Sequence, residues 1–295
     1  MELRLPQPGV WLAIGLAALV IAVQSALSVP VAMIDMAVRE ALHRTSGLLH
    51  NPLVLGLMNT LAFGVVIAFG LYLNRLPLRR AYPLPPATAG QVGALCLLVV
   101  GSVVVLSEID NLVRAVLPMP DILRDLLDQI FSADSSILAQ AFLLVVVAPV
   151  TEELLFRGII LRGLLNHCRV WSALVLSATL FAFIHLNPWQ MMTAFAVGLT
   201  LGWVFLRTGS VWLCVLGHAL NNGLFLCAQH SPFEVPGLIG VPDPDKVVFQ
   251  PLWLDLLGIS LVLVALWLFR CATPRPPPVK LDVPPVIEPP IISAP

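Results

Sequence analysis

The sequence predicts an all-α, polytopic membrane protein with about eight transmembrane helices. Of its 295 residues, 58% are hydrophobic and only 11% are charged, whereas roughly 25% are charged in an ordinary soluble domain. Apolar windows of about 20 residues, the length that a helix needs to cross a bilayer, recur between short polar or proline-containing connections. Helices are expected because strands in lipid would leave backbone groups unpaired and no alternating barrel pattern appears.

The expected spans follow one another from near the N-terminus to residue 269. They are Val10 to Val31, Leu53 to Leu73, Gly90 to Leu106, Ile137 to Leu155, Trp171 to His185, Trp189 to Leu206, Val211 to Cys227 and Leu252 to Phe269. The fourth helix is expected to continue to about Leu165. The first apolar stretch follows Arg4 as in a signal peptide, but it runs on to Val31, which favours a retained span.

One transmembrane domain is expected over residues 1–273, with the residues of chemical interest at about 137–227. Residues 274–295 contain Pro-Pro-Pro and two Pro-Pro pairs, which predicts an extended, disordered tail. Residues 120–131 have an apolar and a charged helical face and predict a short helix along the outer interface. The five cysteines have no CxxC spacing and are expected to be apolar fillers.

The Lys and Arg residues of the connecting segments set the expected orientation. With the N-terminus inside, eleven cations fall on the inner side (Arg4, Arg75, Arg79, Arg80, Arg157, Arg162, Arg169, Arg207, Arg270, Arg275 and Lys280) and five on the outer side (Arg39, Arg44, Arg114, Arg124 and Lys246). This excess predicts cytoplasmic N- and C-termini in a cell membrane, which we expect to be a bacterial inner membrane. The formal net charge of -1, without a basic stripe, excludes nucleic acid as an expected partner.

Ionisable side chains inside the apolar spans need an explanation, because each costs at least ~2.5–3.5 kcal/mol on insertion scales. The fourth span contains Glu152, Glu153 and Arg157. At about 100° per residue, Glu153 and Arg157 lie on one helical face and predict an ion pair. Glu152 points elsewhere and is left over, so it is the candidate general base.

Two further spans supply polar groups that could meet this carboxylate. Phe181 and His185 share one face of the fifth span, and His218 and Asn222 share one face of the seventh. Counted from the inner helix ends, Glu152 and His185 lie about 20 Å deep and His218 about 10 Å deep. Each group alone also suits a structural role, since buried His and Asn commonly bond neighbouring helices.

Together these residues resemble the CPBP intramembrane protease family, which includes the CAAX prenyl proteases and the abortive-infection-like proteins. The matching motifs, in chain order, are Glu-Glu-x-x-x-Arg at Glu152, Glu153 and Arg157, Phe-x-x-x-His at Phe181 and His185, and His-x-x-x-Asn at His218 and Asn222. Flanking matches include Ala-Pro before the glutamates and Thr-Gly-Ser at 208–210, and the resemblance covers about residues 137–226.

The resemblance implies an endopeptidase that cuts a hydrophobic or membrane-tethered polypeptide. Glu152 would activate water with help from His185 and His218, Asn222 would hold the oxyanion, and Glu153, Arg157 and Phe181 would support them. The family is called a metalloprotease family, so Glu152, His185 and His218 would be the ligands of a divalent metal such as zinc. The sequence leaves a metal-free mechanism equally open, since it lacks His-Glu-x-x-His.

Two other functions use the same residues and stay open at this point. A transporter could use the buried carboxylate and imidazoles as a proton relay or cation site, although no internal repeat is evident. A non-catalytic immunity or assembly factor could keep the fold and only bind a peptide. Cleavage that depends on Glu152 would favour the endopeptidase, and transport that depends on Glu152 would favour the transporter. Peptide binding that does not depend on Glu152 would favour the non-catalytic factor.

Overall fold

The computed structural model describes residues 9–42, 47–74, 77–82, 85–121, 123, 136–240 and 246–273. It is 82% helical and has no strand in this described part. Seven helices or continuous helical rods are long and apolar enough to cross a membrane. The predicted polytopic, all-α membrane bundle is thereby confirmed.

The helices follow the expected spans closely. The first half contains α1 (Val10–Leu42), the 3-10 turn η1 (Leu48–His50), α2 (Pro52–Leu73), the short α3 (Leu78–Ala81) and α4 (Ala89–Val116). The second half begins with one rod made of α6 (Ile137–Ala141), η2 (Phe142–Val147), α7 (Ala148–Leu155), η3 (Phe156–Leu161) and α8 (Arg162–Leu165). It continues with α9 (Val170–Phe183), α10 (Pro188–Thr208), α11 (Val211–Gln229) and α12 (Leu252–Ala272).

Two differences from the expected spans concern helix length. The fifth span corresponds to α9, whose 14 residues reach only about 21 Å, short of a hydrocarbon core of about 30 Å. Conversely, α1 and α4 continue well past the ends of their apolar windows, because helical hydrogen bonding does not stop where hydrophobicity does. The predicted interfacial helix at 120–131, apart from Pro120, Asp121 and Leu123, and the Pro-rich tail lie outside the described residues.

Polar residues at the helix ends explain where several spans begin. The Asn51 side chain accepts a hydrogen bond from the backbone of Leu53 at the start of α2. Thr88 and Gln91 form a reciprocal capping box at the start of α4, and the Ser210 hydroxyl caps α11. Gly209 ends α10 with a left-handed φ of 66°, a conformation that glycine adopts without steric cost. Among these caps, Ser210 fixes the start of a helix that carries a polar motif, since His218 and Asn222 lie on α11.

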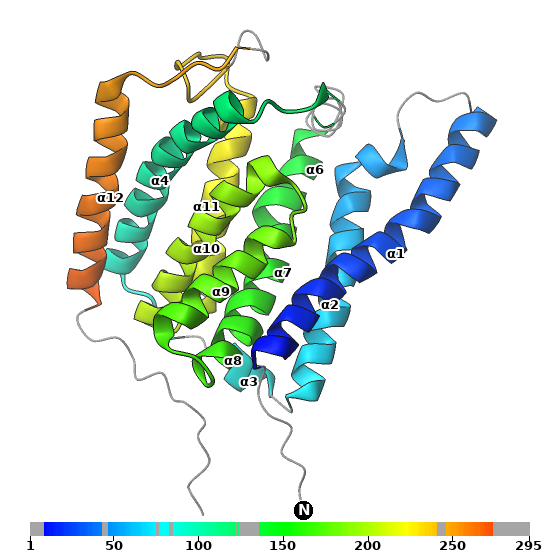
Figure 1. Ribbon diagram of the computed structural model, residues 1–295, viewed down its shortest axis with the longest axis horizontal. Helices are drawn as coiled ribbons and strands as arrows, with labels where there is room; N and C mark the ends of the chain where they lie inside the picture. The colour runs from blue at the N-terminus through cyan, green and yellow to red at the C-terminus, as the bar shows by residue number, and fades with distance from the viewer. Residues whose placement is uncertain are drawn as a thin grey trace, which may run out of the picture.

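The ends of α1 and α12 lie at the same end of the bundle: α1 begins there and α12 ends there (Figure 1). Helix α12 packs closely along α4 because Gly101 has no side chain. A Cβ atom at this position would lie only 2.9 Å from the backbone nitrogen of Val262. The side of the membrane to which this end belongs remains the prediction from charge. Arg157, one of the eleven inner cations, lies buried inside the bundle, so ten loop cations rather than eleven support the predicted orientation.

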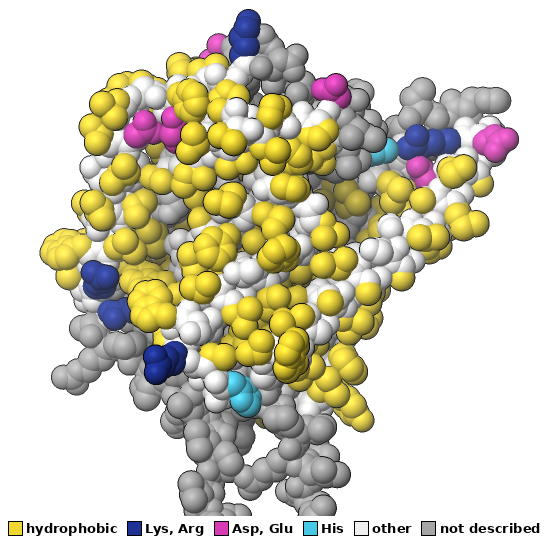
Figure 2. Space-filling view, in the orientation of Figure 1, with side chains coloured by type: hydrophobic (Ala, Val, Ile, Leu, Met, Phe, Trp, Pro, Cys, Tyr) yellow, Lys and Arg dark blue, Asp and Glu magenta, His cyan; other side chains and the backbone are white. Residues whose placement is uncertain are grey.

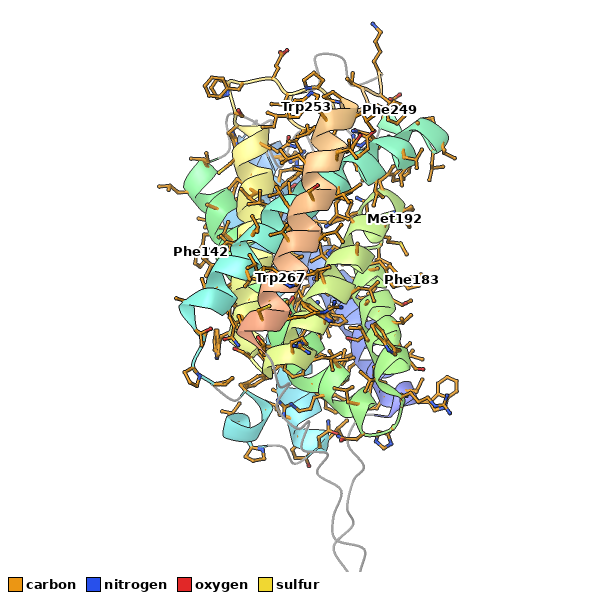
Figure 3. The ribbon with its side chains drawn as sticks, turned by 90° about the vertical axis from the view of Figure 1, so that its left-hand side faces the viewer. Phe142, Phe183, Met192, Phe249, Trp253 and Trp267 are labelled. Atoms are coloured by element: carbon orange, nitrogen blue, oxygen red, sulfur yellow. The ribbon has the colours of Figure 1, made fainter. Side chains whose placement is uncertain are left out.

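The surface has the pattern of a membrane protein. Hydrophobic side chains cover the middle of the visible face, whereas charged side chains gather toward its two ends (Figure 2). Large apolar residues such as Phe142, Phe183 and Trp267 point outward from the bundle (Figure 3) and are each about half or more exposed. Such a belt is expected where lipid, not water, covers the side chains.

Candidate active site

The helix that carries the two glutamates lies between two π-helical segments. Helix α7 is preceded by η2 and followed by η3, both with π-helical hydrogen bonding. Segments of this kind are rare and occur frequently at functional sites. Glu152 and Glu153 are both buried here, so two carboxyl groups occupy the interior of a membrane bundle.

Glu153 is the centre of a buried ion-pair network. Arg157 Nη1 donates to Glu153 Oε1 at 2.8 Å, which is the pair that their spacing predicts. The same oxygen accepts from His218 Nδ1 at 3.0 Å, across from α11. Arg157 Nη2 also donates to the carbonyl of Gly198 in α10 at 3.2 Å. Glu153 and Arg157 therefore join the α6–α8 rod to α10 and α11.

The ring of Phe181 connects this network to His185. The Phe181 and His185 rings lie 5.3 Å apart between centroids, and the Phe181 and His218 rings 5.7 Å apart. The Arg157 guanidinium carbon lies 4.9 Å from the centre of the Phe181 ring, within range of a cation–π interaction. Phe181 is thus the common neighbour of both histidines and of the arginine.

The hydrogen bonds of the two histidines determine which ring nitrogen carries a proton. His185 Nδ1 lies 2.9 Å from the carbonyl oxygen of Phe181, and His218 Nδ1 contacts the Glu153 carboxylate. Because carbonyl and carboxylate oxygens accept, each Nδ1 must be the donor. In a neutral imidazole the Nε2 atom is then an acceptor, suited to hold the hydrogen of a water molecule or to bind a metal.

Glu152 has an unsatisfied oxygen. Its side chain is buried, and its Oε2 atom has no hydrogen-bond partner among the described residues. No hydrogen bond joins it to His185 or His218, and the carboxylate that contacts His218 is Glu153. A buried polar atom without a partner is uncommon in a native protein and needs an explanation such as a catalytic role or a bound water.

Asn222 lies one turn beyond His218 and is held by two hydrogen bonds. Its Nδ2 donates to the carbonyl of Leu144 in η2 at 2.9 Å, and its Oδ1 accepts from Asn221 at 3.2 Å. The amide nitrogen has two hydrogens, so one N–H remains for another acceptor.

Counting from the helix ends predicted that His218 lies about 10 Å less deep than Glu152. The structure shows no such separation, since His218 contacts Glu153, the neighbour of Glu152, directly. The reason is that the α6–α8 rod extends further toward that end of the bundle than the first residue of α11 does.

A three-ligand metal centre does not fit the donor arrangement seen here. Among the residues that the structure describes, no group of three or more His, Cys, Asp or Glu side chains could hold a metal ion. The Nδ1 hydrogen bonds of the two histidines leave each Nε2 atom available, but no described hydrogen bond or ion pair brings Glu152 to either imidazole. The three expected ligands, Glu152, His185 and His218, are thus not gathered into a metal-binding group in this arrangement, and a bound metal stays a prediction.

The residue after His185 has an unusual backbone. Leu186 has a φ of 50°, in the left-handed region that non-glycine residues seldom adopt, and its side chain is exposed. This turn ends α9 and returns the chain into α10. Backbone strain of this kind commonly lies at functional sites, where the surrounding structure enforces it.

Sequence reasoning missed several contacts around the motifs. Gly198 and Gly202 are four residues apart in α10, and a Cβ atom at Gly202 would lie 2.4 Å from Leu174 of α9. This small-residue spacing is the signal that could have predicted the close approach of α10. Gly158, the residue after Arg157, is covered by Tyr82: a Cβ atom there would lie 2.2 Å from the tyrosine ring. No local pattern in the sequence indicates this second contact.

A polar chain also connects α7 to the first two helices. Gln24 donates to Asn59 Oδ1 at 3.2 Å, and Asn59 donates to Thr151 Oγ1 at 3.0 Å. Thr151 in turn donates to the carbonyl of Val147 at 2.8 Å. The residue beside Glu152 is thereby fixed to α1 and α2.

Comparison with known proteins agrees with the motifs. Residues 134–224 match the family described as type II CAAX prenyl endopeptidase Rce1-like. The chain is 26% identical over 87 residues to the Bacillus subtilis (strain 168) protein named "Putative membrane peptidase YdiL". That alignment covers 30% of this chain and 36% of the relative, so the chain spans about a third of the relative's length. No solved structure matches. The matched segment contains all three motifs, and through it the chain is similar to this family.

Proposed function

We propose that the protein is a membrane endopeptidase in which Glu152 activates a water molecule to hydrolyse a peptide bond of a hydrophobic or membrane-tethered polypeptide. The observation that carries the proposal is that the buried Glu152 side chain has no hydrogen bond or ion pair among the described residues, whereas the neighbouring Glu153 has two partners on its Oε1 atom. Glu153 Oε2 also has no partner, but the negative charge of Glu153 is already engaged by Arg157 and His218 through Oε1, which favours Glu152 as the base. The similarity of residues 134–224 to the type II CAAX prenyl endopeptidase family supports the same reaction class.

The residues divide the reaction as follows. Glu152 takes one proton from water while the water oxygen attacks the peptide carbonyl carbon. The Nε2 atom of a histidine accepts the second hydrogen of that water and holds it in place. The free N–H of Asn222 donates to the carbonyl oxygen as negative charge develops on it. Glu152 then returns its proton to the leaving nitrogen, which releases an amine and a carboxylic acid.

Glu153, Arg157 and Phe181 act by positioning. The Glu153 carboxylate keeps the proton of His218 on Nδ1, and Arg157 balances the charge of Glu153. Phe181 supplies the carbonyl that does the same for His185. This arrangement is that of a carboxylate orienting an imidazole through its second nitrogen.

The test is cleavage by purified, full-length protein in liposomes. A quenched-fluorescence library of membrane-spanning peptides of about 20 residues is supplied, and products are identified by mass spectrometry. Glu152→Gln keeps the size of the side chain but cannot act as a base, so cleavage is expected to fall about 100- to 10,000-fold. Glu40→Gln, at an exposed position of α1, is the control and is expected to leave cleavage unchanged. Cleavage by Glu152→Gln at the rate of the control would refute the proposal.

A further inference from the structure

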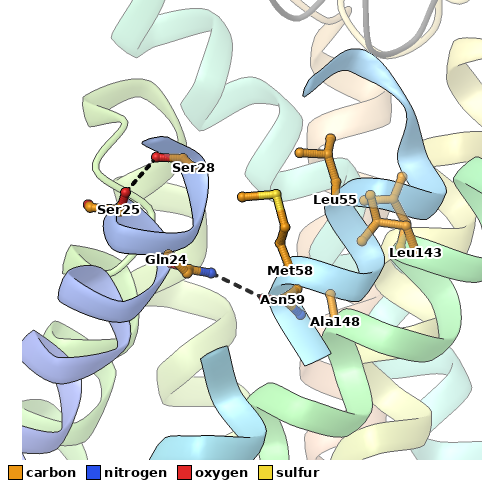
Figure 4. Close-up of a pocket in the computed structure, with 9 residues that line it drawn as sticks. Gln24, Ser25, Ser28, Leu55, Met58, Asn59, Leu143 and Ala148 are labelled. Carbon is orange, nitrogen blue, oxygen red and sulfur yellow. Dashed lines mark hydrogen bonds between the residues drawn. The ribbon is translucent and has the colours of Figure 1, made fainter. Parts of the chain in front are cut away.

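A cavity of about 420 Å³ lies between α1, α2 and the rod that carries the glutamates (Figure 4). We call it the α1–α2 groove and define it by Gln24, Ser25 and Ser28 of α1, Asn59 of α2, and Leu144 and Ala148 of the rod. Its volume falls within the range of about 300–1,000 Å³ typical of ligand pockets. All three walls belong to candidate membrane spans, so the groove opens within the membrane part of the molecule.

The groove adjoins the candidate active site. Ala148 lies one helical turn before Glu152 on α7. The Leu144 carbonyl is the acceptor of the Asn222 amide, and Asn59 bonds to Thr151, the neighbour of Glu152. A chain lying in the groove would therefore have the proposed base and the proposed oxyanion donor at its inner end.

The lining is mostly apolar, including Leu55, Met58 and Leu143, but it contains four uncharged polar side chains, which are Gln24, Ser25, Ser28 and Asn59. Gln24 and Asn59 bond to each other, and the Ser28 hydroxyl donates to the carbonyl of Ser25 at 2.8 Å. The Gln24 amide keeps unused capacity, and the Ser25 hydroxyl is exposed without a partner among the described residues. Donors and acceptors thus line the groove without any charge to attract an ion or an anionic headgroup.

A polypeptide substrate needs such groups before it can be cut inside a membrane. In a helix the scissile carbonyl is hydrogen-bonded and enclosed, so the segment must unwind to reach a nucleophile. An unwound segment in lipid has unpaired N–H and C=O groups, which the bilayer cannot satisfy. Uncharged amides and hydroxyls are the partners that a neutral peptide backbone requires.

We propose that the α1–α2 groove binds an unwound stretch of the substrate polypeptide, pairing its backbone with Gln24, Ser25 and Ser28 next to the cleavage site. This inference rests on the proposed endopeptidase function. It assigns substrate recognition to α1 and α2, which lie outside the segment that matches the protein family.

Photo-crosslinking tests binding without requiring turnover. The probe is a biotinylated, membrane-spanning poly(Leu-Ala) peptide of about 20 residues with a central Gly-Ser-Gly stretch that unwinds readily. Two variants of the full-length Glu152→Gln protein are prepared in liposomes. One has the photo-crosslinking substitution Ser28→p-benzoyl-Phe, and the control has Ser260→p-benzoyl-Phe. Ser260 is matched because it is an exposed serine of α12 whose hydroxyl donates to its own helix, to Leu256, at 2.7 Å. The crosslinking yield at position 28 is expected to be well above that at position 260. Equal yields would refute the proposal that the groove binds the peptide.

Cleavage by the otherwise native protein gives the second readout. Ser28→Leu fills the groove and removes a hydroxyl, so KM for cleaved members of the peptide library is expected to rise roughly tenfold, the scale of one lost hydrogen bond, with kcat little changed. Ser28→Thr restores the hydroxyl and should recover part of the loss, and Ser260→Leu should have no effect. An unchanged KM in Ser28→Leu would refute substrate binding in the groove without contradicting the proposed endopeptidase function. If the native protein cleaves nothing, the proposed function fails, and the crosslinking yields alone decide whether the groove binds peptide.

Discussion

Replacing Arg157 by leucine should be among the most destabilising single changes in the bundle. Arg157 and Glu153 are 1% and 0% exposed in their side chains, so the change leaves a carboxylate buried without its cation. Removing one partner of a buried ion pair costs about 3–5 kcal/mol. The guanidinium also loses its bond to Gly198 and its contact with the Phe181 ring, but these terms act on the same group and are not added.

A surface pair in the same protein provides the control. Arg114 and Asp110 have the same i,i+4 spacing and lie 2.7 Å apart, close to the 2.8 Å of the buried pair, but their side chains are 44% and 28% exposed. Solvent screening limits such a pair to about 0–1 kcal/mol. Arg114→Leu should therefore cost far less than Arg157→Leu, although the two changes delete the same chemical contact.

Unfolding by sodium dodecyl sulfate in mixed micelles, followed by tryptophan fluorescence, measures both variants. The double variant Arg157→Leu with Glu153→Leu removes both charges and should be more stable than Arg157→Leu alone, because it leaves no uncompensated carboxylate. The reasoning fails if Arg157→Leu and Arg114→Leu lower the free energy of unfolding equally, or if removing Glu153 as well gives no recovery.

Three further predictions concern the surroundings of the site. Gly158→Ala should cost about 1–3 kcal/mol, because the added methyl would overlap the Tyr82 ring; the same unfolding assay should show partial recovery with Tyr82→Ala and no recovery if this contact is unimportant. Burial raises the pKa of the Tyr82 hydroxyl above its ordinary value, while the Arg162 charge acts in the opposite direction. The folded state thus favours the neutral phenol, and its contribution to stability is complete below about pH 10 and is lost at higher pH. Tyr82→Phe should reduce the fall in melting temperature between about pH 9 and about pH 11, and an identical fall would contradict this. Asn222→Ala should lower kcat about 100- to 1,000-fold yet cost only about 1 kcal/mol of stability; a loss of stability large enough to explain the loss of activity would contradict a role in the reaction.

Much of the fold could be predicted from the sequence because a membrane allows few alternatives. Apolar windows of spanning length must be helices, and polar caps such as Thr88 and Ser210 fix where two of them begin. A small difference at α9 is also physical: the expected span reaches His185, but the helix ends at Phe183 in a strained turn. Hydropathy does not report such a turn.

The site was predictable where it depends on one helix and not where it depends on several. Four-residue spacing within a helix predicts the pair of Glu153 and Arg157, and that pair is present. The partner of His218 could not be obtained in this way, because the rotation of α11 relative to α7 depends on packing between helices. In the structure His218 forms its hydrogen bond with Glu153, and Glu152 has no hydrogen bond to either histidine.

The two π-helical segments around α7 have a consequence for how this site tolerates insertions and deletions. A π turn is equivalent to an α-helix with one extra residue, so η2 and η3 each hold about one residue more than a regular helix would need to join α7 to the rod beyond it. Deleting a single residue within 156–161 could therefore convert η3 to regular α-helix while α7 and α8 keep their rotational setting, whereas a deletion within α7 itself would rotate one part of the rod by about 100° against the other. The rod should thus tolerate the loss of one residue in either π-helical segment better than the loss of one residue in α7, which carries both glutamates.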